Sequence, residues 1–465
     1  MLKNKSSKRI LAICLTLIFV LLLVGCGGNS GTTAENNSTT SGAAKEQAPA
    51  QNETKTDTKS DAKKEVTINF LADNRPEFDK MLKLYPEFEK ATGIKLNYMQ
   101  LQETPLRAKT GLELSAASTD INVIMMDFTF CAKYARAGYL EPLNDYLAKE
   151  PTFKADDFMK PFLDACSLDN KLYAVPINQD CSILMYRADL FKKYNLHVPK
   201  TFEELENCAK VIKEKEPGMS GIALRGQRGA GLNEWTWPTF LWGFGGQYYD
   251  LNTYKAVLNS KEAVKSLEYY SNLLKKYGPE GAANYSYVEV QTDLMQGKTG
   301  MIIDSATLAI RCENSSESKV AGKLGYAVVP GEPGKAQPGF YAWTLAIPKN
   351  SKNKDAAAKF VAWLASPDIA SKVGWSAPNQ ALSSVYKIPA YADYSESVPL
   401  LQVMLDSLKL ANPDFRPRLN EGAEISTRVS EAISEVLAGG STAKAALDKC
   451  NADVDKILKD GGYQK

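Results

Sequence analysis

The chain contains a single histidine, His197, among 465 residues. A metal site that needs two imidazoles is therefore excluded, and any histidine-dependent catalysis would rest on one residue. The sequence also has no P-loop, no G-x-S-x-G elbow, no H-E-x-x-H helix and no C-x-x-C pair. These absences remove the common signatures of nucleotide binding, serine hydrolysis and zinc binding. We expect no cofactor, no metal site and no catalytic residue.

Positively and negatively charged residues are nearly equal in number. Lys and Arg number 56 and Asp and Glu number 54, which gives a formal net charge of +2. Nucleic acid is not expected as a partner, because phosphate binding needs concentrated Lys and Arg. Composition leaves a glycosidase carboxylate pair open, although an ordinary solvated surface also accounts for so many acids. The length and the 44% hydrophobic content predict a soluble globular protein with two or three domains, or one large two-lobed unit.

The amino end carries a basic segment followed by an apolar run over residues 10–24. Fifteen helical residues span ~23 Å, which is short for a membrane span and typical of a signal-peptide core. A short transmembrane anchor is the alternative. The stretch Leu23-Val24-Gly25-Cys26 resembles the lipobox of bacterial lipoproteins. That resemblance implies a signal peptide over 1–25 and a diacylglyceryl group on Cys26, which two acyl chains would hold at a membrane.

The segment from Cys26 to residue 64 is rich in small, polar and charged residues and offers nothing that could seed a core. Such a composition predicts a flexible linker. We therefore expect a lipid-anchored protein on the outer face of the bacterial cell membrane. Six cysteines follow the linker, and sequence alone leaves both disulfides and buried free thiols open.

The folded part begins near Glu65 with alternating strands and helices. "VTINFLADN" alternates as a strand, and "INVIMMD" is a continuous apolar run, as expected of a buried parallel strand. This rhythm predicts an open parallel sheet with helices on both faces, in which ligands bind beyond the carboxyl ends of the strands. Asn74 and Asp127 both follow strand ends, so they are the first candidates for a site.

A second unit is expected from near Cys181. Thr201 and Glu204 form a predicted capping box at the start of a helix that ends at Pro217-Gly218. Residues 221–224 and 300–304 are predicted strands, residues 260–277 are a predicted helix, and the carboxyl end is predicted to be mostly helical.

An aromatic-rich stretch, "RGQRGAGLNEWTWPTFLWGFGGQYYD", covers residues 225–250. Flat aromatic faces stack on the C–H faces of sugar rings, while nearby carboxylates and amides bind hydroxyl groups. We expect Glu234 and Trp235 at a ligand and Trp237, which precedes Pro238, in packing. A tryptophan-rich core is the alternative.

Two further segments combine polar and aromatic residues where the chain is expected to cross between lobes. Gln179 and Asp180 follow a strand in "LYAVPINQDCSILMYRADLF", and Tyr341 and Trp343 begin another in "GFYAWTLAI". Exposed polar groups and aromatic rings at such crossings would face a cleft.

The sequence resembles the extracellular solute-binding proteins of ABC transporters, in the large group that binds sugars and polyols. The resemblance covers about residues 66 to 370 and rests on "AGYLEPLNDYL", "KLYAVP", "LMYRADLFKKYNLHVPKTFEEL", "KKYGPEG", "QGKTGMIID" and "PKNSKNKDAAAKFVAWLASPD". It implies an α/β, two-lobed, periplasmic-binding-protein-like fold with a ligand cleft between the lobes. The implied lobe 1 is 65–178 with about 344–375, and lobe 2 is 179–343 with about 376–465.

The resemblance also implies a set of ligand-binding positions. These are Asn74, Arg75, Asp127, Thr129, Gln179, Asp180, Glu234, Trp235, Asp304, Tyr341, Trp343 and Trp375. Many relatives carry an aromatic residue shortly after the "GMIID" strand, whereas Ser305-Ala306-Thr307 stands here. This departure favours a small, strongly hydrogen-bonded ligand over a long stacking platform.

The function that follows is a lipid-anchored binding protein, not an enzyme, that captures a sugar, polyol or short oligosaccharide for an ABC importer. Its expected partners are this small molecule, the permease subunits and, through the anchor, the membrane, and we expect a monomer. A tethered carbohydrate-active enzyme is the main alternative. A third possibility keeps the fold and changes the ligand to a peptide, an anion or a metal.

Overall fold

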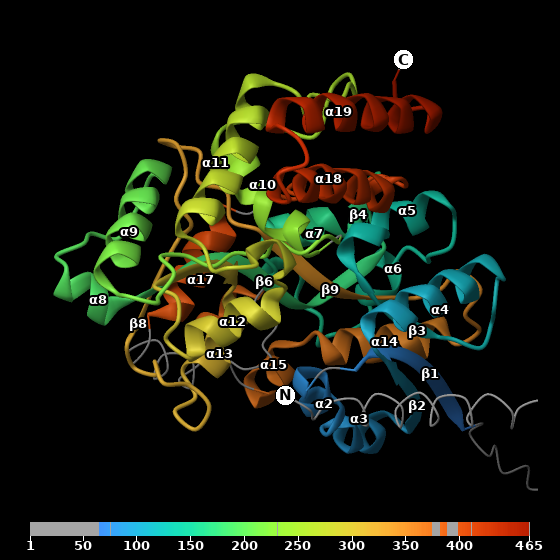
Figure 1. Cartoon of the computed structure of the whole chain (residues 1–465). Helices are drawn as coiled ribbons and strands as arrows, with labels where there is room; N and C mark the ends of the chain where they lie inside the picture. Colours follow the sequence, from blue (N-terminus) through green and yellow to red (C-terminus); the bar gives the residue numbers. More distant parts are fainter. Residues whose placement is uncertain are drawn as a thin grey trace, which may run out of the picture. The chain divides into compact units, whose positions relative to one another are not determined.

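The structure is a computed structural model that describes residues 65–74, 76–229, 231–373, 382–387, 399–410 and 412–464 (Figure 1). The predicted signal peptide and the segment from Cys26 to residue 64 lie outside these ranges. So do two of the predicted site residues, Arg75 and Trp375. Within the described ranges, no helix is both long and apolar enough to cross a membrane.

Seven strands of the described part form one sheet in the order β2-β1-β3-β9-β6-β7, with β8 also paired to β6. Two short strands, β4 and β5, form a separate antiparallel pair. The bounds are β1 (Val66–Asp73), β2 (Ile94–Leu101), β3 (Val123–Asp127), β4 (Ser167–Leu168), β5 (Lys171–Leu172), β6 (Ala174–Arg187), β7 (Met301–Ser305), β8 (Leu324–Ala327) and β9 (Phe340–Ala346).

The parallel sheet predicted from the sequence is found in the first three strands only. β1 pairs in parallel with β2 and β3. β9 then pairs antiparallel with both β3 and β6, and β7 and β8 pair antiparallel with β6. The sheet is mixed because β9 returns from late in the chain and enters between β3 and β6 in the opposite direction.

Helices cover the sheet on both faces (Figure 1). Those of the described part are α2 (Pro76–Leu82), α3 (Tyr85–Thr92), α4 (Glu103–Ser115), α5 (Cys131–Arg136), α6 (Asn144–Leu147), α7 (Lys160–Ala165), α8 (Ala188–Lys193), α9 (Phe202–Lys215), α10 (Asn233–Gly243), α11 (Lys261–Tyr277), α12 (Tyr287–Met295), α13 (Ala309–Cys312), α14 (Lys354–Leu364), α15 (Pro367–Val373), α17 (Leu400–Lys409), α18 (Gly422–Leu437) and α19 (Ala443–Asp460). Short 3-10 turns are η1 (Phe128–Phe130), η2 (Ala155–Asp157), η3 (Ala282–Asn284), η4 (Ala306–Leu308) and η5 (Ser383–Lys387).

Local sequence signals explain where several of these helices begin. The capping box predicted at α9 is present, with Thr201 accepting from the backbone N–H of Glu204 and Glu204 accepting in return. The helix predicted over 260–277 is α11, capped by Ser260. The strand predicted over 221–224 is reduced to isolated bridges, Ser220 to Thr299 and Ala223 to Ile302.

Buried apolar residues form two clusters. The first core includes Phe70 and Met126, and the second core includes Leu205 and Trp237. Strand β6 contributes to both, because Ile183 belongs to the first core and its neighbour Leu184 to the second. Successive side chains of a strand point to opposite faces, so this part of the sheet has a core on each side.

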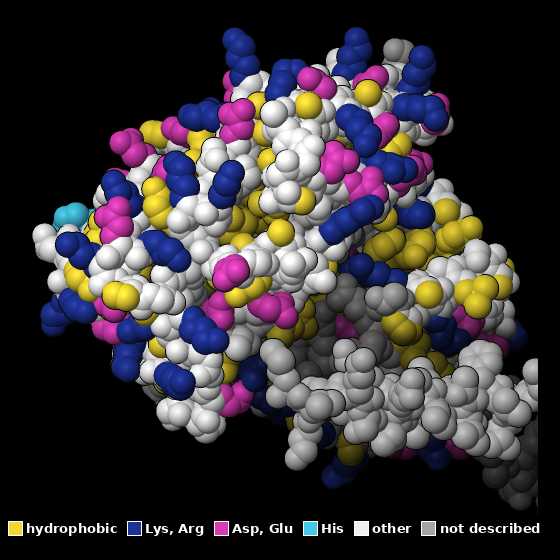
Figure 2. Space-filling model, viewed as in Figure 1, with side chains coloured by type: hydrophobic (Ala, Val, Ile, Leu, Met, Phe, Trp, Pro, Cys, Tyr) yellow, Lys and Arg dark blue, Asp and Glu magenta, His cyan; other side chains and the backbone are white. Residues whose placement is uncertain are grey.

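The carboxyl-terminal helices complete the second core. α18 and α19 lie side by side and pack on α10 and α11 (Figure 1). On the face drawn in Figure 2, Lys and Arg side chains are interspersed with Asp and Glu over these helices. The mixture agrees with a net charge close to zero.

Candidate ligand-binding site

The register of three adjacent strands brings the predicted crossing residues together. Trp343 of β9 lies opposite Asp127 at the end of β3. On the other side of β9, Tyr341 lies opposite Asp180 of β6, and Gln179 lies opposite Ala342. Residues that are between 161 and 216 positions apart in the sequence therefore occupy neighbouring positions in the sheet.

The carboxylate of Asp127 is held in place by three donors. Its Oδ2 atom accepts from Nη2 of Arg107, on α4, at 2.8 Å. Its Oδ1 atom accepts from the backbone N–H of Thr129 at 2.9 Å and from the hydroxyl of Thr129 at 2.8 Å. Asp127 is buried and caps η1, so its orientation is fixed by the strand end and the turn that follows.

Asp180 is a second buried carboxylate in the same layer. Its Oδ2 atom accepts from the hydroxyls of Ser305 and Thr307, the latter at 2.7 Å, and its Oδ1 atom accepts from the backbone N–H of Cys181 at 2.8 Å. Burial raises the pKa of the Asp180 carboxyl above its ordinary range, although these hydrogen bonds act to lower it.

Asp304 is fully buried and is paired with Arg225. The Nε atom of Arg225 lies 2.9 Å from Oδ2 of Asp304, and Nη2 also contacts this carboxylate. The guanidinium of Arg225 is 5.7 Å from the ring centroid of Trp235 and 5.4 Å from that of Tyr287. Asp304 therefore orients Arg225, which in turn lies against the indole of Trp235.

Glu234, at the start of α10, binds donors from the carboxyl-terminal segment. It accepts from Nε of Arg416 at 3.0 Å, from the hydroxyl of Ser426 at 3.0 Å and from the hydroxyl of Tyr248 at 3.1 Å. Glu234 is fully buried, and Arg416 is 7% exposed. This pair joins the loop before α18 to α10.

Aromatic rings fill the space between these polar groups. The Trp235 ring meets the Tyr341 ring edge to face at 6.2 Å and the Phe415 ring at 6.2 Å. Tyr341 in turn meets Trp343 at 5.8 Å and Phe128 at 6.1 Å. Trp235, near the start of α10, packs against Tyr341 and Phe415, whereas Trp237 is part of the second core, as predicted.

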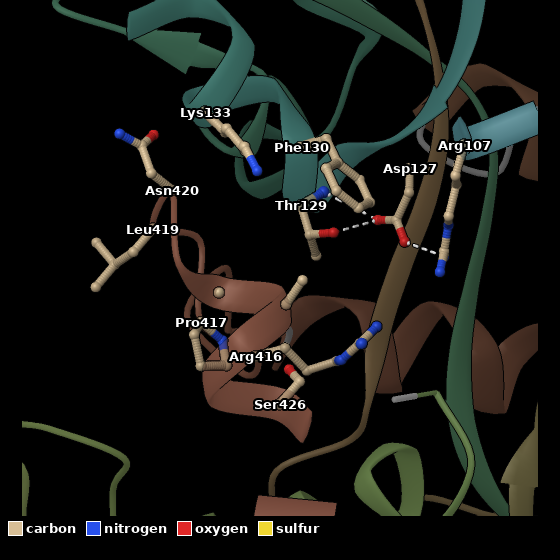
Figure 3. Close-up of a pocket in the computed structure, with 12 residues that line it drawn as sticks. Arg107, Asp127, Thr129, Phe130, Lys133, Arg416, Pro417, Leu419, Asn420 and Ser426 are labelled. Carbon is tan, nitrogen blue, oxygen red and sulfur yellow. Dashed lines mark hydrogen bonds and ion pairs between the residues drawn. The ribbon is translucent and has the colours of Figure 1, made fainter. Parts of the chain in front are cut away.

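A pocket opens between Asp127 and Arg416 (Figure 3). Its empty space is about 430 Å³, counting the part that is open to solvent. Its lining residues are Arg107, Asp127, Thr129, Phe130, Lys133, Arg416, Pro417, Leu419, Asn420, Gly422, Ala423 and Ser426. In Figure 3 the side chain of Arg416 extends toward Asp127 and Arg107, and Lys133 points into the same space.

The two walls of this pocket belong to different cores. Phe130 packs against the first core, whereas Leu419 is part of the second. Arg107 is bonded to Asp127 on the first wall, and Ser426 and Arg416 share Glu234 on the second. A molecule in the pocket would therefore contact both halves of the fold.

The predicted site residues occupy three kinds of position. Asp127 and Thr129 line the pocket. Those in the packed layer beside it are Gln179, Asp180, Glu234, Trp235, Asp304, Tyr341 and Trp343. Asn74 is exposed beyond β1, where its backbone N–H donates to the carbonyl of Leu101 at 2.9 Å, and it does not line the pocket.

Sequence reasoning missed Arg107 and Arg416. Arg107 lies in the middle of α4, where nothing in the local sequence separates it from a solvated arginine. Arg416 lies in "PDFRPRLNEG", between α17 and α18. The sequence feature that points to Arg416 is the pair Arg416 and Arg418 within a loop of Pro, Asn and Gly. From such a loop, a long arginine side chain can reach a neighbouring lobe.

Electrostatics link the two walls. Burial by itself lowers the pKa of the Arg416 guanidinium, but the carboxylates of Glu234 and Asp127 outweigh this effect and raise the pKa above its ordinary value. Arg416 therefore stays charged and is attracted to carboxylates on both sides of the pocket.

The described residues contain no group of three or more His, Cys, Asp or Glu side chains that could hold a metal ion. The cysteines from Cys131 to Cys450 are free and buried. Burial raises the pKa of the Cys131 thiol to about 12, and that of Cys312 likewise to about 12. Thiols in such surroundings are poor nucleophiles.

The model of one protein family, bacterial extracellular solute-binding protein, matches residues 72–371. The chain belongs to this family. The family works outside the cytoplasm and serves ABC transporters, and its members and neighbours described below are binding proteins. The resemblance stated from the sequence is confirmed.

Relatives of this solute-binding protein include the mannitol-binding protein of Pseudomonas aeruginosa, which is 28% identical over 419 residues, covering 86% of this chain and 94% of that one. A solute-binding protein of Agrobacterium vitis with bound D-mannitol is 30% identical with a TM-score of 0.74, covering 85% of this chain and 99% of that chain. A solute-binding protein of Agrobacterium radiobacter in complex with ribitol is 28% identical with a TM-score of 0.75, covering 84% and 98%. The predicted α/β, two-lobed fold is thereby confirmed.

Proposed function

We propose that this solute-binding protein captures a sugar, a polyol or a short oligosaccharide outside the cell and presents it to the permease subunits of an ABC importer. The observation that carries the proposal is the pocket between Asp127 and Arg416, whose walls come from the two cores. Relatives named for mannitol and ribitol support a polyhydroxylated ligand.

The mechanism would be hinge closure. A ligand that contacts Asp127 on one wall and Arg416 on the other makes its full set of contacts only when the lobes are closed. It therefore stabilises the closed state by the contacts that the open state lacks. The permease would respond to the closed form, and an affinity near 1 μM, about 8 kcal/mol, would allow both capture and release.

Residues beside the pocket would also contribute to ligand binding. Trp235 and Tyr341 would offer apolar ring surface to the C–H groups of the ligand. Asp180 would contribute to ligand binding together with the hydroxyl groups of Ser305 and Thr307, which donate to its carboxylate. Closely spaced polar groups and edge-on rings suit a small ligand better than a long oligosaccharide.

The protein would work at the outer face of the cell membrane, with the permease subunits as its partners. The protein would be tethered by lipid at Cys26, would act as a monomer and would bind its ligand without catalytic turnover. The relation to binding proteins supports the absence of turnover. The lobe boundaries expected from the sequence, 65–178 with about 344–375 and 179–343 with about 376–465, remain part of the proposal.

Trp235→Phe tests the ligand site and Trp237→Phe is the matched control. The indole N–H groups of both side chains have no hydrogen-bond partner among the described residues. Only Trp235 packs against Tyr341, whereas Trp237 lies within the second core. In calorimetric titrations with D-mannitol and ribitol, we expect Trp235→Phe to weaken binding roughly three- to ten-fold. Trp237→Phe should keep the affinity and lower the unfolding free energy by about 1–2 kcal/mol.

Equal affinities in both variants would remove Trp235 from the site. Incubation of the unaltered protein with glycosides serves as the second arm, in which we expect binding without product release. Catalytic product release would support the carbohydrate-active enzyme instead. Mass spectrometry of the small molecule that co-purifies with the protein would identify the ligand directly.

A further inference from the structure

Arg416 uses only part of its hydrogen-bonding capacity. Its Nε atom donates to both carboxylate oxygens of Glu234, at 3.0 and 3.3 Å. Within the described residues, its Nη1 and Nη2 groups have no hydrogen-bond partner, although the side chain is 7% exposed and lines the pocket. Neither of these two groups is a fully buried polar atom without a partner, and the residue lines the pocket, so this terminal fork is accessible to oxygen atoms of a ligand.

The charges around the pocket favour a neutral ligand. On one wall Arg107 is paired with Asp127, and on the other Arg416 is paired with Glu234. Each guanidinium therefore has its own carboxylate. Lys133 is the remaining cation of the lining, and it is only partly buried, so water can solvate its ammonium group.

Asp127 supplies the complementary acceptor. An ionised carboxylate has about four lone-pair positions, and three donors, one from Arg107 and two from Thr129, already occupy three of them. One position remains for a ligand proton. A donor fork on one wall and an acceptor on the other match hydroxyl groups, which both accept and donate.

We infer that Arg416 is a specificity-determining residue whose Nη1 and Nη2 groups hold two oxygens on adjacent carbon atoms of the ligand. The recognised unit is a neutral vicinal diol, and one of its hydroxyls donates to Asp127. This inference rests on the proposed function and adds which part of a polyol is read. It selects against acids, because a carboxylate at the fork would lie beside Asp127 and Glu234.

Arg416→Lys is the direct test, and Arg418→Lys is the matched control. Lysine keeps a positive charge near Glu234 but lacks the fork. Arg418 lies two residues on, donates Nε and Nη2 to Asp414, and does not line the pocket. In calorimetric titrations with D-mannitol, we expect Arg416→Lys to lose roughly ten- to a hundred-fold in affinity. Arg418→Lys should bind as the unaltered protein does.

Two ligand comparisons on the unaltered protein keep the inference testable if Arg416→Lys does not fold. Pentaerythritol has four hydroxyls but no vicinal pair, and we expect it not to bind. D-mannonate replaces one end of mannitol with a carboxylate, and we expect it to bind more weakly than mannitol.

Three results would overturn the inference: mannitol affinity unchanged in Arg416→Lys, pentaerythritol binding as tightly as mannitol, or mannonate binding more tightly than mannitol. Each of these leaves the proposed function standing, because a polyhydroxylated ligand is still bound. If the unaltered protein binds no sugar or polyol at all, the proposed function fails and the inference fails with it.

Discussion

Asp180 illustrates how a single buried carboxylate carries both a cost and a use. It is 7% exposed and accepts hydrogen bonds from Ser305, Thr307 and the backbone of Cys181. These bonds offset only part of the cost of burying a charge, because the pKa remains raised. A group that costs stability at neutral pH suggests a functional reason for its presence.

The sign of this effect gives a pH prediction. Because the pKa of Asp180 is raised in the folded protein, its proton contributes stability below the ordinary value of 3.8, and this contribution is lost as the pH rises through the raised pKa. Asp180→Asn has no such proton to lose. We expect the melting temperature of Asp180→Asn to rise relative to the unaltered protein between pH 3 and pH 7.

Melting curves recorded over this pH range check the prediction, with Asp156→Asn, at an exposed position, as the control. A difference between Asp180→Asn and the unaltered protein that stays constant with pH would contradict it. The same variant should bind a polyol more weakly if Asp180 belongs to the ligand network.

At the residue scale, the sequence predicted the position of Asp127 at a strand end that lines the pocket, while its ligand contact stays a prediction. Asp127 could be predicted because it ends a buried strand, and ligands of open sheets bind at such ends. Arg107 and Arg416 could not, because what distinguishes them is the space in front of their guanidinium groups. That space is created by packing between segments about 300 residues apart.

At the scale of elements, local signals were reliable and buried helices were not. The capping box at Thr201 and Glu204 correctly predicted where α9 begins. The sequence of α10 indicates only an aromatic-rich stretch, because the helix contains Pro238 and is buried on nearly every side. A helix without a solvent face has no amphipathic period to detect.

Gly221 gives a testable contact between α9 and the segment that follows it. A Cβ atom at this position would lie 2.0 Å from the carbonyl oxygen of Ala209 and 2.7 Å from its Cα atom. Both are backbone atoms of α9, so the helix itself would have to shift. We expect Gly221→Ala to lower the unfolding free energy by about 1–3 kcal/mol in denaturant titrations.

Gly111→Ala is the control for that experiment. In α4, a Cβ atom there would meet only the Tyr134 hydroxyl, at an ordinary 3.8 Å. Alanine should be neutral or stabilising by up to about 1 kcal/mol, because it favours a helix more than glycine does. Similar losses in both variants would show that close packing at α9 is not the cause.

At the scale of the whole molecule, the two-lobed fold was accessible from the sequence through its motifs. The order of β9 in the sheet was not, because an antiparallel return between β3 and β6 leaves no local mark. The consequence is that β6 and β9 connect the two halves as neighbours in one sheet, with Asp180 opposite Tyr341.

The expected lipid anchor on Cys26 predicts where the whole protein is found in a cell fractionation. If Cys26 carries the lipid, Cys26→Ser should move the protein from the membrane fraction to the medium or the periplasm. Cys14→Ser is the matched control, because Cys14 lies within the apolar run and not at its boundary. Immunoblots of separated fractions check the outcome, and membrane retention of Cys26→Ser would contradict lipidation at that sulfur.

The pairing of each pocket guanidinium with its own carboxylate has a consequence for the surroundings in which this protein works. Dissolved ions screen the attraction between separated, solvent-exposed charges. They have little effect on contacts between a neutral ligand and a pocket whose charges are already paired. Uptake that depends on the Arg107–Asp127 and Arg416–Glu234 pairs would therefore change little with ionic strength.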